Sequence, residues 1–174
     1  PADVLTLLGY ATTHKKTAVR LLTAGAAADI LHRHRGLPGQ APLPKEVRAE
    51  VTRLVSGFDP IGNPSVLMVW SALADEAAIT RLGRTLRDPR QPARVGAVVA
   101  ARRMALSAAG ADLHALEAAL AGWLTDRRLA PDTRAELARL AGESGWVSLA
   151  PALSSVKAAG GAPELHTVAE RFVK

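Results

Sequence analysis

The sequence predicts an all-α protein built as a stack of helix pairs, and three observations lead to this prediction. Every long segment carries apolar residues at helical spacing, and strict alternation over five or more residues is absent, so no strand is expected. The apolar residues are mostly Ala, Leu and Val, which suit close helix packing better than a β-sandwich. A short signature, an apolar residue or Thr followed by a basic residue, also recurs where helices are expected to begin. It occurs at Val19-Arg20, Val47-Arg48, Ala93-Arg94, Thr133-Arg134 and Leu165-His166.

The spacing of this signature indicates a repeat architecture. Its basic residues lie 28, 46, 40 and 32 positions apart, which brackets the period of known helix-pair repeats. A helix pair cannot bury its apolar stripe alone, so successive pairs must stack on one another. We expect one domain over residues 1–174, since the Pro- and Gly-rich loops at 37–44 and 57–64 are short. Such stacks usually bind partners, so the pattern favours a binding protein.

Apolar stripes and helix-stop signals predict about ten helices. Gly36, Gly57, Gly110 and Gly160-Gly161 stand where helices should end, because glycine adopts the left-handed C-cap conformation easily. Asn63-Pro64 is typical of a helix start, with Asn as the cap and Pro at the first helical position. The stripes are Val19, Leu22, Ala26 and Ile30; Ile79, Leu82 and Leu86; Leu113, Leu116, Leu120, Trp123 and Leu124; and Leu165, Val168, Ala169 and Phe172. The expected helices cover residues 2–12, 15–35, 44–56, 64–74, 76–87, 91–109, 111–126, 131–142, 146–158 and 162–173.

The stretch from Ile79 to Met104 carries the clearest repeat pattern. Leu86 stands two residues before Asp88 in the expected turn, Arg94 follows six residues after that Asp, and small residues come next at Ala97 and Ala101. This stretch resembles the HEAT-like repeats of bacterial scaffold proteins. A second copy, with two extra residues in its turn, occurs at Leu124, Asp126, Arg134, Ala138 and Ala141. The resemblance implies a right-handed α-α superhelix with structural roles for four residues, Asp88, Arg94, Asp126 and Arg134.

The positive charge of the chain is concentrated in its first part. The net charge is +6, with 15 Lys and Arg against 8 acids in residues 1–110 and 7 against 8 in residues 111–174. Such asymmetry favours an acidic partner, including nucleic acid. A GC-rich genome, in which Arg codons are common, would give the same excess of Arg.

An Arg cluster is the most specific candidate for a binding surface. Seven Arg lie within 23 residues that contain one acid, Asp88. Three interpretations stay open: a solvated face with one structural Arg, a phosphate-binding stripe, or a docking surface for an acidic protein. A second group includes Lys15 and Lys16, which are expected at a helix start, where cations are slightly unfavourable. The candidate partner- or phosphate-binding residues are Arg81, Arg84, Arg87, Arg90, Arg102, Arg103, Lys15 and Lys16.

Signatures of catalysis and of metal or cofactor binding are weak. The chain has no Cys, no Gly-rich phosphate loop and no G-x-S-x-G motif. His32 and His34 would face opposite sides of a helix, and the remaining His lie in three other segments, so no metal site and no cofactor are expected. A remote alternative is a helical-repeat DNA glycosylase-like enzyme using Trp70, Trp123 and Trp146 with Asp75 or Asp126. All three Trp lie in apolar stripes, which favours core packing over base stacking.

These observations predict a non-catalytic scaffold that grips an acidic partner protein. The predicted concave face is lined by the second helix of each pair, and Arg94, Arg102 and Arg103 share one such helix. The alternative is sequence-nonspecific DNA or RNA binding through the segments Arg81–Arg103 and Lys15–Arg20, which would weaken if these two basic groups faced different ways. No apolar run reaches the length of a membrane span, no signal peptide is evident, and the absence of Cys favours the cytoplasm.

Overall fold

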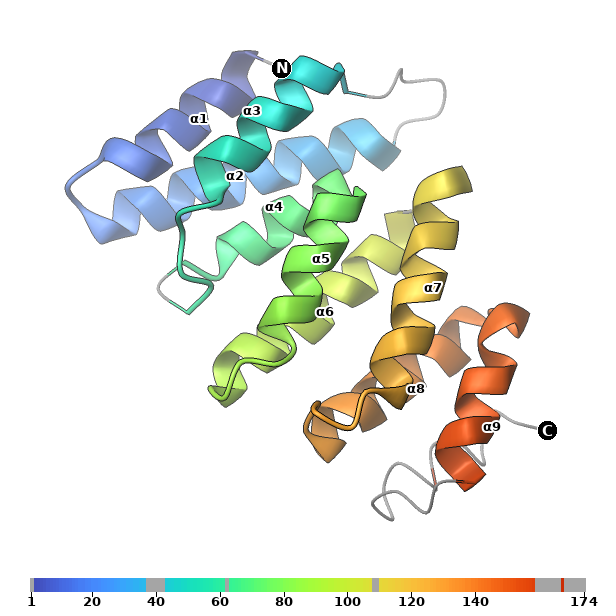
Figure 1. The fold of residues 1–174 in the computed structure, drawn as a ribbon. Coiled ribbons are helices and arrows are strands. Elements are labelled where there is room, and N and C mark those ends of the chain that lie inside the picture. The colour runs from blue at the N-terminus through green and yellow to red at the C-terminus, as the bar shows by residue number, and fades with distance from the viewer. Residues whose placement is uncertain (1, 37–42, 62, 108–109, 159–166, 168–174) are drawn as a thin grey trace.

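The structure is a computed structural model that describes residues 2–36, 43–61, 63–107, 110–158 and 167 (Figure 1). Within these ranges all regular structure is helical, which confirms the predicted all-α class. The predicted helix over 162–173 lies, apart from Thr167, outside the described residues. The helices are α1 (Ala2–Thr13), α2 (Thr17–Gly36), α3 (Lys45–Val55), α4 (Ser65–Leu73), α5 (Glu76–Thr85), α6 (Gln91–Ser107), α7 (Gly110–Thr125), α8 (Pro131–Ser144) and α9 (Ala150–Ala158).

The helices alternate between two layers. The first-helix layer contains α1, α3, α5, α7 and α9, which lie toward the viewer in Figure 1. The second-helix layer contains α2, α4, α6 and α8, and each of these helices packs against the next one in this order. The two helices of each pair also contact each other across the layers, α1 with α2, α3 with α4, α5 with α6 and α7 with α8. Stacked helix pairs are therefore the organising unit of the chain.

Local sequence signals set most helix boundaries. Asp75 caps α5 because its carboxylate accepts a hydrogen bond from the Ala78 N–H at 2.8 Å. Pro131 stands in the first turn of α8, and Gly145 ends this helix with a left-handed φ of 66°. These three residues show cap chemistry of the kind that predicts helix ends from sequence.

Most helix boundaries differ from the sequence prediction by one or two residues, and two of them differ in kind. Asn63 was expected to cap the fourth helix with its side chain, but Pro64 is the cap residue, and only the Asn63 backbone carbonyl accepts a bond, from the Val66 N–H. The expected helix over 146–158 is divided into a 3₁₀ turn, Val147–Leu149, and α9. Pro151 explains the division, because it has no N–H to donate to the carbonyl four residues earlier.

The core lies between the two layers and is built mainly from Leu and Ala. The buried residues form one cluster that runs from α1 to α9. Trp123 of α7 packs so closely on Gly83 of α5 that a Cβ at this glycine would lie 2.8 Å from the indole Nε1. Small residues thus let neighbouring helices approach closely, as their abundance in the sequence indicated.

Candidate functional site: the turn edge and the α6–α8 groove

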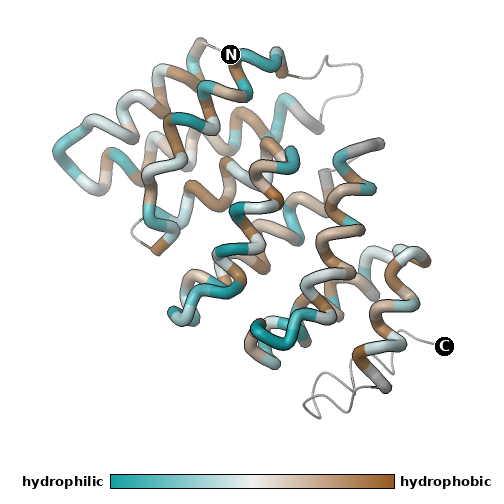
Figure 2. Tube along the Cα trace, viewed as in Figure 1, coloured by the Kyte–Doolittle hydropathy of each residue, from teal (hydrophilic) through white to brown (hydrophobic). Residues whose placement is uncertain are grey.

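The four turns that join first to second helices lie along one edge of the stack, here called the turn edge (Figure 1). They are the α1–α2, α3–α4, α5–α6 and α7–α8 turns. Figure 2 shows that the last two turns are strongly hydrophilic. Most charged residues that the sequence proposes for binding lie on this edge or on the helices beside it.

Three successive turns repeat the same local geometry. The carboxylates of Asp59, Asp88 and Asp126 each accept the backbone N–H two residues later, at 3.3, 2.9 and 3.0 Å. This Asx turn fixes the chain direction between the two helices of a pair. Asp88 and Asp126 were predicted as equivalent repeat positions, whereas Asp59 was missed. The dipeptide Asp59-Pro60, which matches Asp88-Pro89, was the signal that could have identified it.

Ion pairs join these turns to one another. Arg90 donates to Asp88 at 2.8 Å and to Asp59 of the preceding turn at 3.2 Å. Arg87 donates to Asp126 of the following turn at 2.7 Å, where Arg128 binds the same carboxylate at 3.0 Å. The result is two sets of Arg–Asp contacts, Asp59–Arg90–Asp88 and Arg87–Asp126–Arg128, which together link three turns and are called here the turn ladder. Two proposed binding residues, Arg87 and Arg90, are therefore engaged within the chain.

The turn ladder stabilises the charged form of its carboxylates. The Arg90 side chain donates to Asp88 and lowers the pKa of this carboxyl group from 3.8 to about 2. The pKa of Asp126 is lowered further, first by the Arg128 side chain, then by the Arg128 backbone N–H and by Arg87. The ladder is therefore an acid-sensitive element of the fold.

The repeat Arg residues hold the turns from the second-helix side. Arg94 donates to the carbonyls of Asp88 and Pro89 at 3.1 and 2.8 Å, and Arg20 donates to the Ala11 carbonyl at 3.1 Å. Both are the fourth residue of their helix, α6 and α2, and Arg134 has the same position in α8. The predicted signature thus marks three second helices. In two of them its Arg donates to backbone carbonyls, of the preceding turn for Arg94 and of the last turn of α1 for Arg20.

Arg48 departs from the other described copies of the signature. It lies in α3, which belongs to the first-helix layer, and donates to the Leu43 carbonyl at 3.3 Å. The second helix of that pair, α4, has Met68 at the fourth position instead of a basic residue. In this pair the signature therefore marks the start of the first helix and not of the second.

The remaining Arg residues of the cluster are divided between the two layers. Arg81 of α5 stacks over the Trp70 ring, 5.7 Å from its centroid, and Arg84 is exposed on the same helix. Arg102 and Arg103 lie on α6 in the second-helix layer, where Arg102 pairs with Glu143 of α8 at 3.2 Å. The seven Arg that are clustered in the sequence therefore do not form one stripe in the structure.

Lys15 and Lys16 are exposed in the α1–α2 turn. They share the turn edge with Arg87 and Arg90, although at its other end (Figure 1). Some residues of both predicted basic groups therefore lie on the turn edge, whereas Arg102 and Arg103 lie on α6.

The residues considered for base recognition are used in packing and capping. Trp70 and Trp123 are buried in the core, and Trp146 packs against it. Asp75 caps α5 and Asp126 belongs to the turn ladder. Among the described residues no group of three or more His, Asp or Glu side chains is arranged to hold a metal ion. None of the helices in the described part of the chain has the length and apolar character needed to cross a membrane.

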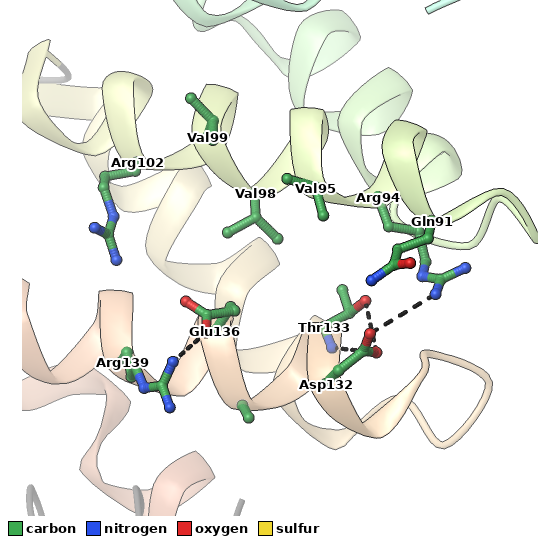
Figure 3. A pocket seen from close by; sticks show the side chains of 11 residues that line it. Gln91, Arg94, Val95, Val98, Val99, Arg102, Asp132, Thr133, Glu136 and Arg139 are labelled. Carbon is green, nitrogen blue, oxygen red and sulfur yellow. Dashed lines mark hydrogen bonds and ion pairs between the residues drawn. The ribbon is translucent and has the colours of Figure 1, made fainter. Parts of the chain in front are cut away.

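A groove of about 460 Å³ lies between α6 and α8 on the second-helix layer (Figure 3). Its apolar part includes Val95 and Val99, which are 55% and 47% exposed, and Val98, which points toward α8 (Figure 3). Val95 and Val99 lie about one turn apart on α6, so the groove exposes a small apolar patch. The lining residues are Gln91, Arg94, Val95, Val98, Val99, Arg102, Asp132, Thr133, Ala135, Glu136 and Arg139.

The two walls of the groove differ in charge. Among the lining residues, the α6 wall carries Arg94 and Arg102 and no acid, whereas the α8 wall carries two acids, Asp132 and Glu136, and one base, Arg139, which pairs with Glu136. Ion pairs cross the groove near both ends, from Arg94 to Asp132 at 3.8 Å and from Arg102 to Glu143 at 3.2 Å. The sequence identified Arg102 as a candidate but not the valines, because their i, i+3, i+4 spacing is also typical of buried residues.

A smaller cavity of about 380 Å³ opens on the turn edge between the α1–α2 turn and the α3–α4 loop. Arg20 lines it and stacks over the Phe58 ring at 5.6 Å. Asn63 also lines it, and its side-chain amide is buried without a hydrogen-bond partner among the described residues. Since both amide atoms are closed to solvent, this cavity offers a ligand less accessible chemistry than the groove does.

Comparison of the chain with protein-family models, with curated proteins and with solved structures found no match.

Proposed function

We propose that the protein is a non-catalytic binding module whose second-helix layer holds a segment of a partner protein. The observation that carries this proposal is the α6–α8 groove, where exposed Val95 and Val99 lie between two charged walls. In this proposal the stack is a right-handed superhelix of HEAT-like pairs, and the second helices line its concave face. An apolar centre with a charged rim is the usual composition of a protein-binding surface.

Acidic side chains of the partner would contact α6. Arg94, Arg102 and Arg103 lie on this helix, which carries no acidic residue in its described part. The Arg residues of the turn ladder are less suited to this role, since Asp59, Asp88 and Asp126 already accept their hydrogen bonds. Arg102 lines the groove and is 43% exposed, so it is the residue of α6 that we expect an acidic side chain to contact.

Selection from random peptides tests this proposal directly. The immobilised protein would be used to select from a display library of random peptides of about 16 residues, which is more than four helical turns. We expect binders that contain apolar and acidic residues and that lose binding to Val95→Asp and Val99→Asp. A matched control is Leu22→Asp on α2, where the native side chain is 73% exposed and lies outside the groove. A selection that yields no binder sensitive to the two valine substitutions would overturn the proposal.

Nucleic-acid binding is the second candidate function, and the shared edge of two basic groups favours it. Lys15, Lys16 and Arg84 are exposed on or beside the turn edge and have no role in the turn ladder. Contacts of such residues with phosphates would weaken steeply between about 50 and 200 mM salt. The test is fluorescence anisotropy of a labelled duplex with the wild type, Lys15→Glu/Lys16→Glu and Val99→Asp. Salt-sensitive binding that only the Lys substitutions remove would favour this function over the scaffold.

A further inference from the structure

We propose that the segment held in the α6–α8 groove is an amphipathic α-helix with acidic side chains on one flank and basic side chains on the other. The acidic flank would face α6 and the basic flank would face α8. This inference rests on the proposed function and adds the conformation and the charge pattern of the bound segment.

The conformation follows from the backbone of the groove. Both walls are helices, so the backbone N–H and C=O groups of their central turns are bonded within α6 and α8. An extended segment over Val95, Val98 and Val99 would bring backbone polar groups that find no partner there, which is costly. A helical segment satisfies its own backbone groups and needs only apolar side chains at the contact. The groove therefore fits a helix better than an extended chain.

The length of the groove fits two to three turns of such a helix. Its lining extends from Gln91 to Arg102 on α6, which corresponds to about 17 Å along the helix axis. The contact surface is narrow, because Val95 and Val99 are the exposed valines of the α6 wall and Val98 is nearly buried. A partner helix would cover it with apolar residues at i, i+3, i+4 and i+7, the spacing of a single helix face.

The charge pattern follows from the two walls. Arg102 on the α6 side, 43% exposed, would attract acidic residues of the bound helix. Asp132 and Glu136 on the α8 side, 55% and 42% exposed, would attract basic residues, with Glu136 exchanging its exposed pair with Arg139 for a base of the partner. The Arg102–Glu143 pair is about half exposed, with side-chain exposures of 43% and 53%. Exposed pairs contribute little stability, so Arg102 can exchange Glu143 for a carboxylate of the partner at small cost.

The charge walls also predict a directional property of binding. A helix that lies across its apolar face exchanges its left and right flanks when its chain direction is reversed. Two peptides of the same composition, with the acidic and basic flanks exchanged, should therefore both bind, but in opposite directions along α6. A peptide with its charges mixed on both flanks cannot match either wall in any direction.

The experiment starts from the selected peptides whose binding depends on Val95 and Val99. Circular dichroism of the complex should show that these peptides become helical, and a central Pro should weaken binding at least about tenfold. Mixing the charges of the two flanks should weaken binding about two- to five-fold. Exchange of the flanks should preserve affinity, and a spin label at the peptide N-terminus should then broaden NMR signals at the opposite end of α6.

Four outcomes separate the possible errors. Groove-dependent peptides that tolerate Pro and stay non-helical would overturn the helical inference and leave the proposed function intact. Helical binders that are indifferent to flank mixing, or keep their direction after flank exchange, would overturn the charge pattern. A selection without groove-dependent binders overturns the proposed function and this inference together. A concentration-dependent dimer that Val99→Asp abolishes would instead make a second copy of the chain the occupant of the groove.

Discussion

The turn edge and the α6–α8 groove contain the same kinds of charged residues, yet the two regions engage them differently. On the turn edge, Asp88 and Asp126 are only 18% and 10% exposed, and each accepts hydrogen bonds from side chains and from a backbone N–H. In the groove, the ion pair between Arg102 and Glu143 is about half exposed and has a single contact. Because solvent screens exposed pairs, the same chemistry stabilises the fold on the turn edge and remains available for binding in the groove.

Arg94 belongs to both regions and gives the largest expected effect. Its guanidinium donates to two turn carbonyls and also lies 3.8 Å from Asp132 in the groove. Arg94→Ala should reduce the free energy of unfolding by about 2–3 kcal/mol, because two turn carbonyls lose a charged donor. Urea unfolding of Arg94→Ala and Arg94→Lys would measure this effect. We expect Arg94→Lys to lose less unfolding free energy than Arg94→Ala, because the Lys ammonium can still donate to a turn carbonyl. A change below about 0.5 kcal/mol for both variants would place Arg94 with the groove instead.

Asp126 tests the turn edge alone. Asp126→Ala removes the acceptor of Arg87 and Arg128 and opens the Asx turn, so it should cost about 1–2 kcal/mol of unfolding free energy. Asp126→Asn is the matched variant, because the amide oxygen can still accept the Arg128 backbone N–H. A smaller loss for Asn than for Ala would assign part of the effect to the turn geometry, and equal losses would assign all of it to charge.

Acid should reduce the stability that the turn edge contributes to the fold. The folded-state pKa values of Asp88 and Asp126 lie below their unfolded values, so the unfolded state binds protons first as the pH falls. Stability is therefore full above about pH 5 and declines as the pH falls toward about 2. Urea unfolding at several pH values should show a shallower decline for Asp88→Asn than for the wild type. Parallel pH curves would mean that the turn ladder does not contribute to acid unfolding.

Substitutions in the groove should have the smallest effects on stability. Glu143→Ala and Val99→Asp change exposed side chains, so each should alter the free energy of unfolding by no more than about 0.5 kcal/mol. The same Val99→Asp variant should lose the selected peptides completely. Thermal unfolding together with peptide binding would separate the two effects. A large stability loss for Val99→Asp would indicate that the groove is structural, which would remove its contrast with the turn edge.

The sequence was sufficient for the helices and for much of the turn chemistry. Helical spacing and cap residues placed the nine described α-helices within a few residues, because these signals act within one or two turns of chain. Asp88 and Asp126 were recognised as equivalent because each is followed by the same local pattern of turn, Arg and small residues. The errors at Asn63 and at Pro151 concern single positions, where a neighbouring proline shifted or divided a helix.

The partners of the charged residues could not be predicted in the same way. Arg90 meets Asp59 across 31 positions, and Arg87 meets Asp126 across 39. Nothing in the local sequence distinguishes these residues of the turn ladder from Arg102, which pairs with Glu143 of α8 and lines the groove. The sequence therefore showed one basic cluster where the structure has a turn ladder, a cation–π contact and a groove wall.

The sequence by itself determined the helical class, the helix order and most helix boundaries to within one or two residues, because hydrophobic periodicity and capping are short-range properties of the chain. Only the tertiary structure decided which valines are exposed and which Arg are matched by acids. Val95, Val98 and Val99 lie on successive turns of one helix, but the position of α8 leaves two of them exposed and nearly buries the third. Exposure and ion pairing depend on neighbours far away in sequence, and the packing of the two layers chooses those neighbours.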